Sequence, residues 1–455
     1  MTIPYRAGNK LTTGSTQSGK SYAEVHDIIA AAETRKVGIV VCDPHKNSLA
    51  RNALSHLVAR GHKRRILWDQ LDELEHTLKY RFLIPSRAAS PVRRAHENRQ
   101  QAEQFSELLC RRREVQSLAT SPLTEEWTLK ACLLLLNQPH DYPAADLRYA
   151  FRVGHPTFER LVRDCTEHDV RHEFEQIACG VIKPGQYNAA ARLINAVCDA
   201  PAFIARCGWA LDFGSFLDNG GILLVEGGAV SQLVLQTILG SIGLQTIHYV
   251  RTRARSSPRV LLAMDEATNA MQIGAAGHEV NACAECQKMG LDIHVLVQSL
   301  NFPNSHITDG ILTNCTRHEW MHAANAAVAR KAADDLGSSD YEERIRTLRV
   351  GQRFVKERDR VWFETVPPLP NPWVFPQLAA KKIQRAIDEI RERPEYGEDP
   401  PCSPGASATT NSNGSPPDTF AGPATSNDSS PARRRRTGGS KNSGDAGSSG
   451  SSGKS

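Results

Sequence analysis

The sequence predicts an α/β protein with a mainly parallel sheet, an all-helical insertion and a disordered C-terminal tail. Short apolar runs of buried-strand type alternate with helical segments over the first ninety residues, and they return after residue 206. Between these two parts, strand signals vanish and apolar residues recur with helical spacing. From about residue 394 the composition collapses to Ser, Gly, Pro, Asn and Thr, which cannot offset the entropy of ordering the chain.

The first segment to justify is a glycine-rich loop near the start of the chain. Residues 14–21 read GSTQSGKS and match G-x-x-x-x-G-K-[ST] at every fixed position. A strand-like run at 11–13 precedes this loop, and the helix-compatible run SYAEVHDIIAAAE follows it. Glycine lets the backbone wrap closely around phosphates, and inward N–H groups bind their charge. We therefore predict an ATP site formed by Gly14, Ser15, Thr16, Gln17, Ser18, Gly19, Lys20 and Ser21.

Within that loop, two side chains have distinct predicted roles. Lys20 would reach the β- and γ-phosphates, and the Ser21 hydroxyl would bind Mg²⁺. The alternative is a Gly/Ser-rich surface turn, which the strand-to-helix context disfavours.

The next strand is expected at residues 37–42, a continuous apolar run that ends in Asp43-Pro44-His45. Carboxyl ends of parallel strands face the ligand crevice, so Asp43 and His45 are expected near the nucleotide or a polymer path. A helix over 47–60 and a strand over 64–68 follow. Residues 1–90 thus form the N-terminal part of the predicted core, and residues 91–205 form the all-helical insertion.

The second part of the core is predicted over residues 206–375, with a strand within 220–228 and a long apolar helix over 230–250. A buried strand at 260–264 then ends in Asp265-Glu266. Carboxylates at this position fit a Walker B site, in which Asp265 holds the Mg²⁺ shell and Glu266 polarises the attacking water. The alternatives are an acidic helix cap at this turn and Glu226 as a rival carboxylate.

The remaining strands carry two further candidates. Gln298 lies in the strand predicted at 291–300, where it would sense the γ-phosphate or orient water, unless it is an ordinary polar strand-end residue. Arg317 lies in a strand predicted at 311–323. A helix at 326–336, strands at 352–356 and 360–365, a C-terminal helix at 376–395 and the tail at 396–455 complete the prediction.

The composition indicates the cellular compartment of the protein and the chemical class of its partner. The eleven cysteines of this 455-residue chain are irregularly spaced and no signal peptide is evident, which favours reduced thiols and a cytoplasmic location. No uninterrupted apolar run approaches the ~18–20 residues that span a bilayer. The net charge of +5 is compatible with a polyanion partner. Basic clusters at 63–65, 93–94, 111–113 and 251–255 favour such a partner, although each alone is typical of a solvated face.

These segments together resemble a known family. Their order is the phosphate loop, VVCDPHK, the helical insertion, LLAMDEATN, VLVQSL, NCTRHEW and LRVGQRFVKERDRVWFETVPP. It resembles the FtsK/HerA superfamily of DNA-pumping ATPases, above all the TraG/TraD-like coupling proteins of type IV secretion and the HerA-type helicases. DPH is similar to the DPHG or DPKG of that group, DEATN to DEF-A/P-N, and QS at 298–299 to ATQS or SQS. The resemblance covers about residues 8–370.

The resemblance implies a RecA-like core in a homo-hexameric ring that hydrolyses ATP between subunits, with double-stranded DNA in its channel. It implies that Arg317 reaches the γ-phosphate of the neighbouring subunit; Arg330 and Arg353 are lesser candidates, and a local ion pair is the alternative for Arg317. A relaxase or a secretion-channel protein is the further expected partner.

Three departures from the family pattern qualify the resemblance. About ten residues precede the phosphate loop, where relatives carry transmembrane helices or a β-barrel, so membrane anchoring is expected only through a partner. Gln17 replaces a usual glycine, and DPHK lacks the following glycine. Besides a DNA translocase, the sequence leaves open an ATP-binding adaptor that recruits a protein or relaxase to a secretion channel, and a packaging or partition NTPase outside this superfamily.

Overall fold

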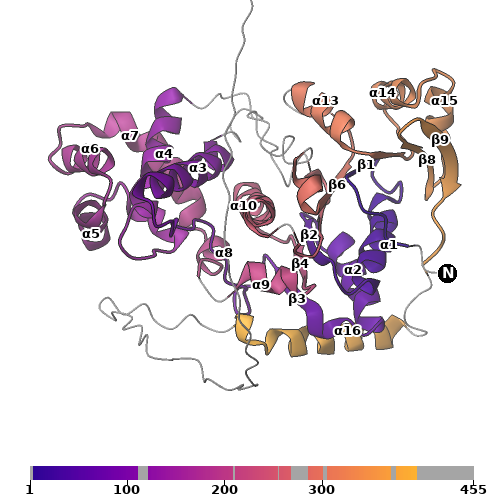
Figure 1. Cartoon of the computed structure of the whole chain (residues 1–455), viewed down its shortest axis with the longest axis horizontal. Helices are drawn as coiled ribbons and strands as arrows, with labels where there is room; N and C mark the ends of the chain where they lie inside the picture. Colours follow the sequence, from indigo (N-terminus) through magenta and orange to yellow (C-terminus); the bar gives the residue numbers. More distant parts are fainter. Residues whose placement is uncertain are drawn as a thin grey trace, which may run out of the picture. The chain divides into compact units, whose positions relative to one another are not determined.

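The computed structural model describes residues 4–110, 121–208, 211–254, 256–267, 285–300, 305–369 and 376–396 (Figure 1). The chain divides into two compact units, Met1–Pro401 and Cys402–Ser455, and every described residue belongs to the first. The tail predicted at 396–455 therefore lies outside the described residues, apart from its first residue.

Within the described residues, nine strands form one sheet in the order β3-β4-β2-β5-β6-β1-β7-β8-β9. Neighbours from β3 to β7 pair in parallel, whereas β7, β8 and β9 pair antiparallel. The α/β fold with a mainly parallel sheet is thus confirmed. The strands are β1 (Lys10–Thr13), β2 (Gly38–Asp43), β3 (Ile66–Gln70), β4 (Ile222–Glu226), β5 (Val260–Met264), β6 (Leu291–Val297), β7 (Arg317–Trp320), β8 (Gln352–Glu357) and β9 (Arg360–Thr365).

The parallel strands are buried on both faces, which explains their continuous apolar sequences. All residues of β2, β4 and β5 are buried. Helices α1 (Lys20–Glu33) and α2 (Leu49–Ala59) pack together on one side of the sheet, and α10 (Gln232–Thr252) lies on the other (Figure 1). Among the described helices, α10 alone has the length and apolar composition to cross a membrane, yet 72% of its most apolar window is buried inside the protein. That burial is typical of a core helix.

Helices occupy the segment between β3 and β4. Trp127, Phe151, Phe174 and Tyr187 form an aromatic cluster inside this segment. Five of the helices begin with proline, whose missing N–H costs nothing in the first turn. The helices are α3 (Pro91–Cys110), α4 (Pro122–Leu136), α5 (Pro156–Asp164), α6 (His168–Ala178), α7 (Pro184–Cys198), α8 (Pro201–Ile204) and α9 (Phe213–Asp218).

One predicted strand is wrong in its first part. The strand expected over 311–323 begins as the end of helix α13 (Ser305–Asn314), and β7 covers only four residues. Thr308, Ile311 and Cys315 are buried at helical spacing, so packing of one helical face overrides the strand preference of the ILT run. Helices α14 (Ala326–Leu336), α15 (Tyr341–Arg346) and α16 (Pro376–Arg391) follow β7, and α16 ends four residues before its predicted end.

Candidate functional site

The sheet places the predicted site residues, apart from Arg317, at the carboxyl ends of neighbouring strands. Strand β6 lies between β1 and β5, and all three run parallel. The glycine-rich loop follows β1, Asp265 and Glu266 follow β5, and Gln298 follows β6. Their side chains therefore meet at the carboxyl ends of these strands, the edge at which open α/β sheets bind ligands.

The loop at 14–21 is anchored to its neighbours by backbone hydrogen bonds. The Gly14 N–H donates to the Val297 carbonyl (3.2 Å), and the Ser15 N–H donates to the His322 carbonyl (2.7 Å). A Cβ at Gly14 would lie 2.6 Å from the Ser18 Oγ, so only glycine fits this tight turn. The loop keeps its shape through these contacts within the chain.

Two residues of the loop have left-handed backbones, Gln17 at φ 64° and Gly19 at φ 102°. Glycine adopts this region freely, whereas a residue with a Cβ is strained there. Gln17 stands where the resembled proteins usually have glycine, and its left-handed backbone is one that glycine adopts more easily. Alternating backbone handedness of this kind turns successive N–H groups inward and makes an anion nest.

Lys20 is buried beneath the loop. Its Nζ donates to the carbonyl oxygens of Gly14 (2.8 Å) and Ser15 (3.2 Å). Burial lowers the pKa of Lys20, and the nearby carboxylates of Glu266 and Asp265 oppose that shift. The ammonium group is thus held beneath the loop, beside the two carboxylates that follow β5.

Ser21 and Asp265 meet across the site. The Ser21 hydroxyl donates to the Asp265 Oδ2 at 2.9 Å, and the Glu266 N–H donates to the Asp265 Oδ1 at 3.0 Å. Burial raises the pKa of Asp265, and the Ser21 hydrogen bond opposes that effect. A hydroxyl beside a buried carboxylate offers the hard oxygen ligands that Mg²⁺ prefers, and a bound cation would stabilise the ionised carboxylate. These two residues fit a Mg²⁺ site.

Glu266 is held in a strained conformation next to Gln298. Its backbone has φ 47°, unusual for a residue with a side chain, and only 6% of the residue is exposed. The Gln298 Nε2 donates to the Glu266 Oε1 at 2.7 Å. The structure therefore brings Lys20, Ser21, Asp265, Glu266 and Gln298 together.

Asp43 and Glu226 stabilise a turn at the same edge of the sheet. The Asp43 carboxylate accepts the N–H groups of His45 (2.9 Å) and Ala50 (2.8 Å), and Glu226 Oε1 accepts the Asn47 N–H (2.8 Å). Burial, with a contribution from the charge of Asp265, raises the pKa of Asp43 to about 8. Both carboxylates hold the turn before α2, while His45 is exposed.

Arg317 lies away from the phosphate loop of its own chain. It pairs in register with Lys10, at the amino end of β1, whereas the loop follows the carboxyl end of that strand. Its guanidinium donates to Glu319 (2.7 Å) and to Glu364 (3.3 Å). Arg353 binds the same two carboxylates. Of the lesser candidates, Arg330 is exposed on α14, 3.6 Å from Glu342.

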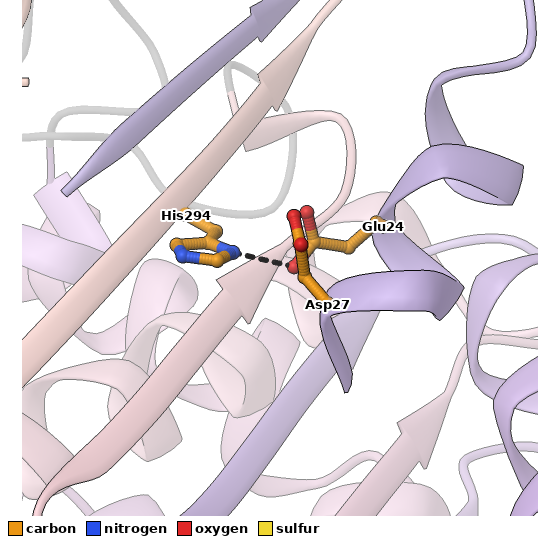
Figure 2. A group of neighbouring side chains, drawn as sticks. All are labelled: Glu24, Asp27 and His294. Atoms are coloured by element: carbon orange, nitrogen blue, oxygen red, sulfur yellow. Dashed lines mark hydrogen bonds and ion pairs between the residues drawn. The ribbon is translucent and has the colours of Figure 1, made fainter. Parts of the chain in front are cut away.

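A buried charge cluster lies beneath the loop helix. Figure 2 shows Glu24 and Asp27, from α1, beside His294, from β6. The His294 Nδ1 is 2.7 Å from the Glu24 Oε1. Their spacing would suit a metal ion, but the Lys10 ammonium already lies 2.5 Å from Glu24 and also binds Asp27. The cation of this cluster is therefore supplied by the chain itself.

An open cleft of about 880 Å³ lies over the loop. Its lining includes residues with no predicted role, among them His322, Asn325 and Arg349. The His322 Nδ1 is 2.8 Å from the Ser15 Oγ. The strand-end rule could have found His322, which follows β7, whereas the LRVGQRF segment that contains Arg349 gave it no predicted role. The cleft is lined by Ser15, Thr16, Gln17, Ser18, Gln298, Ser299, His322, Ala323, Ala324, Asn325, Val328, Leu348, Arg349 and Val350.

Comparison with known proteins finds its matches among solved structures. No protein-family model matches the sequence, and no curated protein matches it. The bacterial conjugative coupling protein TrwBdeltaN70 is 13% identical with a TM-score of 0.56, and the match covers 80% of this chain and 86% of that one. Plasmid coupling protein TrwB in complex with ADP and Mg²⁺ is 11% identical with a TM-score of 0.56, over 80% of this chain and 86% of that one.

VirB4 of Thermoanaerobacter pseudethanolicus is 11% identical with a TM-score of 0.54, and the match covers 80% of this chain and 90% of that one. At such identities the likeness is one of fold. The chain thus has the fold of these two proteins, and its predicted resemblance to coupling proteins of type IV secretion is confirmed at that level.

Proposed function

We propose that this chain is a cytoplasmic ATPase that hydrolyses ATP to move double-stranded DNA, in conjugative transfer or in mobile-element DNA processing. The observation that carries the proposal is the 2.9 Å hydrogen bond between Ser21 and Asp265, which joins the phosphate loop to the strand-end carboxylate. The fold shared with TrwB supports it, because TrwB is known in complexes with ADP and Mg²⁺ and with a non-hydrolysable ATP analogue.

Each residue of the site has a proposed role. The nest of loop N–H groups and Lys20 would hold the phosphates, while Ser21 and Asp265 would hold Mg²⁺, which supplies charge neutralisation when bound. Glu266 would orient and polarise the attacking water, and Gln298, hydrogen-bonded to it, would respond to the γ-phosphate. The burial of Asp265 and Glu266 supports these roles, because electrostatic interactions are stronger away from bulk water.

The assembled form is proposed as a homo-hexameric ring with DNA in its channel. Arg317 is the sequence-based candidate for a residue that acts on the neighbouring subunit's nucleotide. Its contacts with Glu319 and Glu364 would have to open for that role. Arg330 is mostly exposed, and its contact with Glu342 at 3.6 Å is the one that would have to open. A relaxase or a secretion-channel protein is proposed as the loading partner.

The proposal predicts DNA-stimulated ATP hydrolysis that depends on Lys20. We expect the full chain to hydrolyse ATP faster with double-stranded DNA, and Lys20→Ala to abolish that activity because the phosphates lose their buried cation. The measurement is phosphate release with and without DNA; thermal unfolding of the variant serves as the check on its fold. Full turnover in Lys20→Ala would refute the assignment.

A second function is an ATP-binding adaptor with little motor activity, which recruits a protein substrate or relaxase. The engagement of Arg317 in ion pairs within its own chain favours this alternative, because it leaves the proposed intersubunit charge occupied. A hydrolysis rate that ignores DNA but rises with a purified relaxase would support the adaptor over the translocase.

A further inference from the structure

Residues 349–351 pack directly against the phosphate loop. The Gly351 N–H donates to the Ser18 carbonyl at 3.0 Å, and the Val366 N–H donates to the Gly351 carbonyl at 2.8 Å. A Cβ at Gly19 would lie 3.1 Å from the Gly351 nitrogen, so the two backbones are in close contact. The segment that carries Arg349 is therefore fixed relative to the residues that would bind phosphate.

The turn at Arg349 is also held by two hydrogen bonds with Gln352. The Arg349 N–H donates to the Gln352 Oε1 at 2.9 Å, and the Gln352 N–H donates back to the Arg349 carbonyl at 2.9 Å. The backbone is thus constrained on both sides of the residue, while its side chain is exposed and lines the cleft over the loop. Because the backbone is already fixed, binding a ligand would order only the side chain and not the segment that carries it.

The charge around Arg349 suits an anion. None of the described residues that line the cleft carries a carboxylate, and its basic members are Arg349 and His322. Arg317, Arg330 and Arg353 each lie near a carboxylate. Within the described part of the chain, by contrast, no carboxylate pairs with the Arg349 guanidinium. The cleft therefore presents a cation beside Ser15–Ser18 without a neutralising partner.

We propose that Arg349 binds the phosphate tail of the nucleotide within its own chain. The inference rests on the proposed ATP site and adds a residue to it. A guanidinium group presents a planar fork of donors that matches phosphate oxygens, whereas an ammonium acts as a point charge. Arg349 would add its charge from the cleft side of the loop, while Lys20 binds from beneath.

The test is equilibrium titration of the full-length chain with fluorescent ATP and ADP, and with adenosine as a competitor without phosphates. The variants are Arg349→Ala, Arg349→Lys and a matched control, Arg346→Ala. Arg346 is a half-exposed arginine three residues away, 3.6 Å from Glu343, and it does not line the cleft. Lys20→Ala reports on the proposed ATP site itself, and thermal unfolding without nucleotide checks each variant's fold.

We expect Arg349→Ala to weaken ATP and ADP binding by about ten- to hundredfold, the range for a charge-assisted hydrogen bond. Arg349→Lys should bind with intermediate affinity, and Arg346→Ala should match the wild type. Competition by adenosine should be unchanged in every arginine variant, because adenosine lacks the groups that the guanidinium would contact.

Two results would overturn the assignment of Arg349 alone. One is ATP affinity within twofold of wild type in Arg349→Ala while Lys20→Ala has lost binding. The other is an equal loss of adenosine binding, which would place the contact away from the phosphates. A wild-type chain that does not bind ATP, or a Lys20→Ala variant that binds it normally, would instead refute the proposed function together with this inference.

Discussion

At the scale of single residues, Glu266 shows most directly what the site requires. A buried carboxylate on a residue with a left-handed backbone lowers the stability of the fold, and backbone strain of this kind persists only where the surroundings enforce it. Here the enforcing contacts are the hydrogen bond from the Glu266 N–H to Asp265 and the bond from Gln298 to the Glu266 carboxylate. They fix the carboxylate next to Asp265 and within electrostatic reach of Lys20, where a water that attacks the γ-phosphate would need it.

Replacement of Glu266 by glutamine should separate binding from turnover. The amide keeps the size of the side chain and an oxygen for Gln298, but it lacks the charge that polarises water. We expect nearly unchanged ATP affinity and a kcat lower by about 10²- to 10⁴-fold, the range for general acid–base groups. Steady-state hydrolysis with parallel nucleotide titration measures both quantities. A kcat within threefold of wild type would assign the basic role to another residue.

The same scale shows where sequence reasoning stopped. The glycine-rich loop, Asp265, Glu266 and Gln298 lie in local patterns, and the structure brings them together because they follow adjacent parallel strands. Arg349 lies in the LRVGQRF segment that contributes to the family resemblance, but that segment assigns it no role. Its place over the loop depends on backbone contacts such as that between Gly351 and Ser18, more than 300 residues apart in sequence, which only the folded chain reveals.

At the scale of elements, the buried charges of α1 fasten the loop helix to the sheet. Lys10 and His294, on adjacent strands, face Glu24 and Asp27, one to two turns beyond Lys20 on α1. A helix that carries the phosphate loop is thus positioned by ion pairs as well as by apolar packing. Breaking one partner of such a pair leaves an uncompensated buried charge.

Acid should remove the contribution of Glu24 to stability. Burial alone would raise the pKa of Glu24, but the charges of His294 and Lys10 outweigh it and hold the pKa at about 2, below the ordinary 4.5. The carboxylate therefore stabilises the fold fully above about pH 4.5, and this contribution disappears as the pH falls towards 2. At neutral pH it corresponds to about 3 kcal/mol.

Denaturant unfolding of Glu24→Gln against pH measures this contribution. We expect the variant to be less stable than wild type by about 3 kcal/mol at pH 7, with the difference shrinking between pH 4.5 and 2. Glu33→Gln is the control, because Glu33 is exposed on the same helix and its contact with Arg60, at 3.6 Å, is longer than a hydrogen bond. A difference that stays constant with pH would contradict the electrostatic explanation.

The spans of the helices and strands show where the spacing of apolar residues predicts secondary structure correctly. The predicted spans of β5, α14 and β9 agree with the structure because each has one clear pattern with clear ends. The β-branched run at residues 311–314 predicts a strand, but these residues form the end of a helix. The helical spacing shows only when the buried residues Thr308 and Cys315, which lie outside this run, are considered together with Ile311. The strand propensity of a short β-branched segment is therefore overridden where one face of a helix packs against the core.

At the scale of the whole molecule, fold and assembly are separate questions. The order of motifs predicted the α/β fold, which the structure and its likeness to TrwB and VirB4 confirm. Ring assembly depends instead on surfaces that no motif describes, and Arg317 is engaged within its own chain. Assembly therefore has to be tested through its effect on activity.

Mixing subunits would test the proposed ring. If hydrolysis sites lie between subunits and act together, a Lys20→Ala chain in a ring impairs its neighbours as well as itself. We expect the DNA-stimulated rate to fall more steeply than the fraction of wild-type chains when the two proteins are mixed before ATP and DNA are added. Mixing after separate preassembly with DNA is the control, and it should give a linear decrease as long as the mixing time is too short for subunits to exchange. A linear decrease under both protocols, with the chain monomeric in ATP and DNA, would show that each chain hydrolyses ATP alone and would exclude an arginine acting in trans.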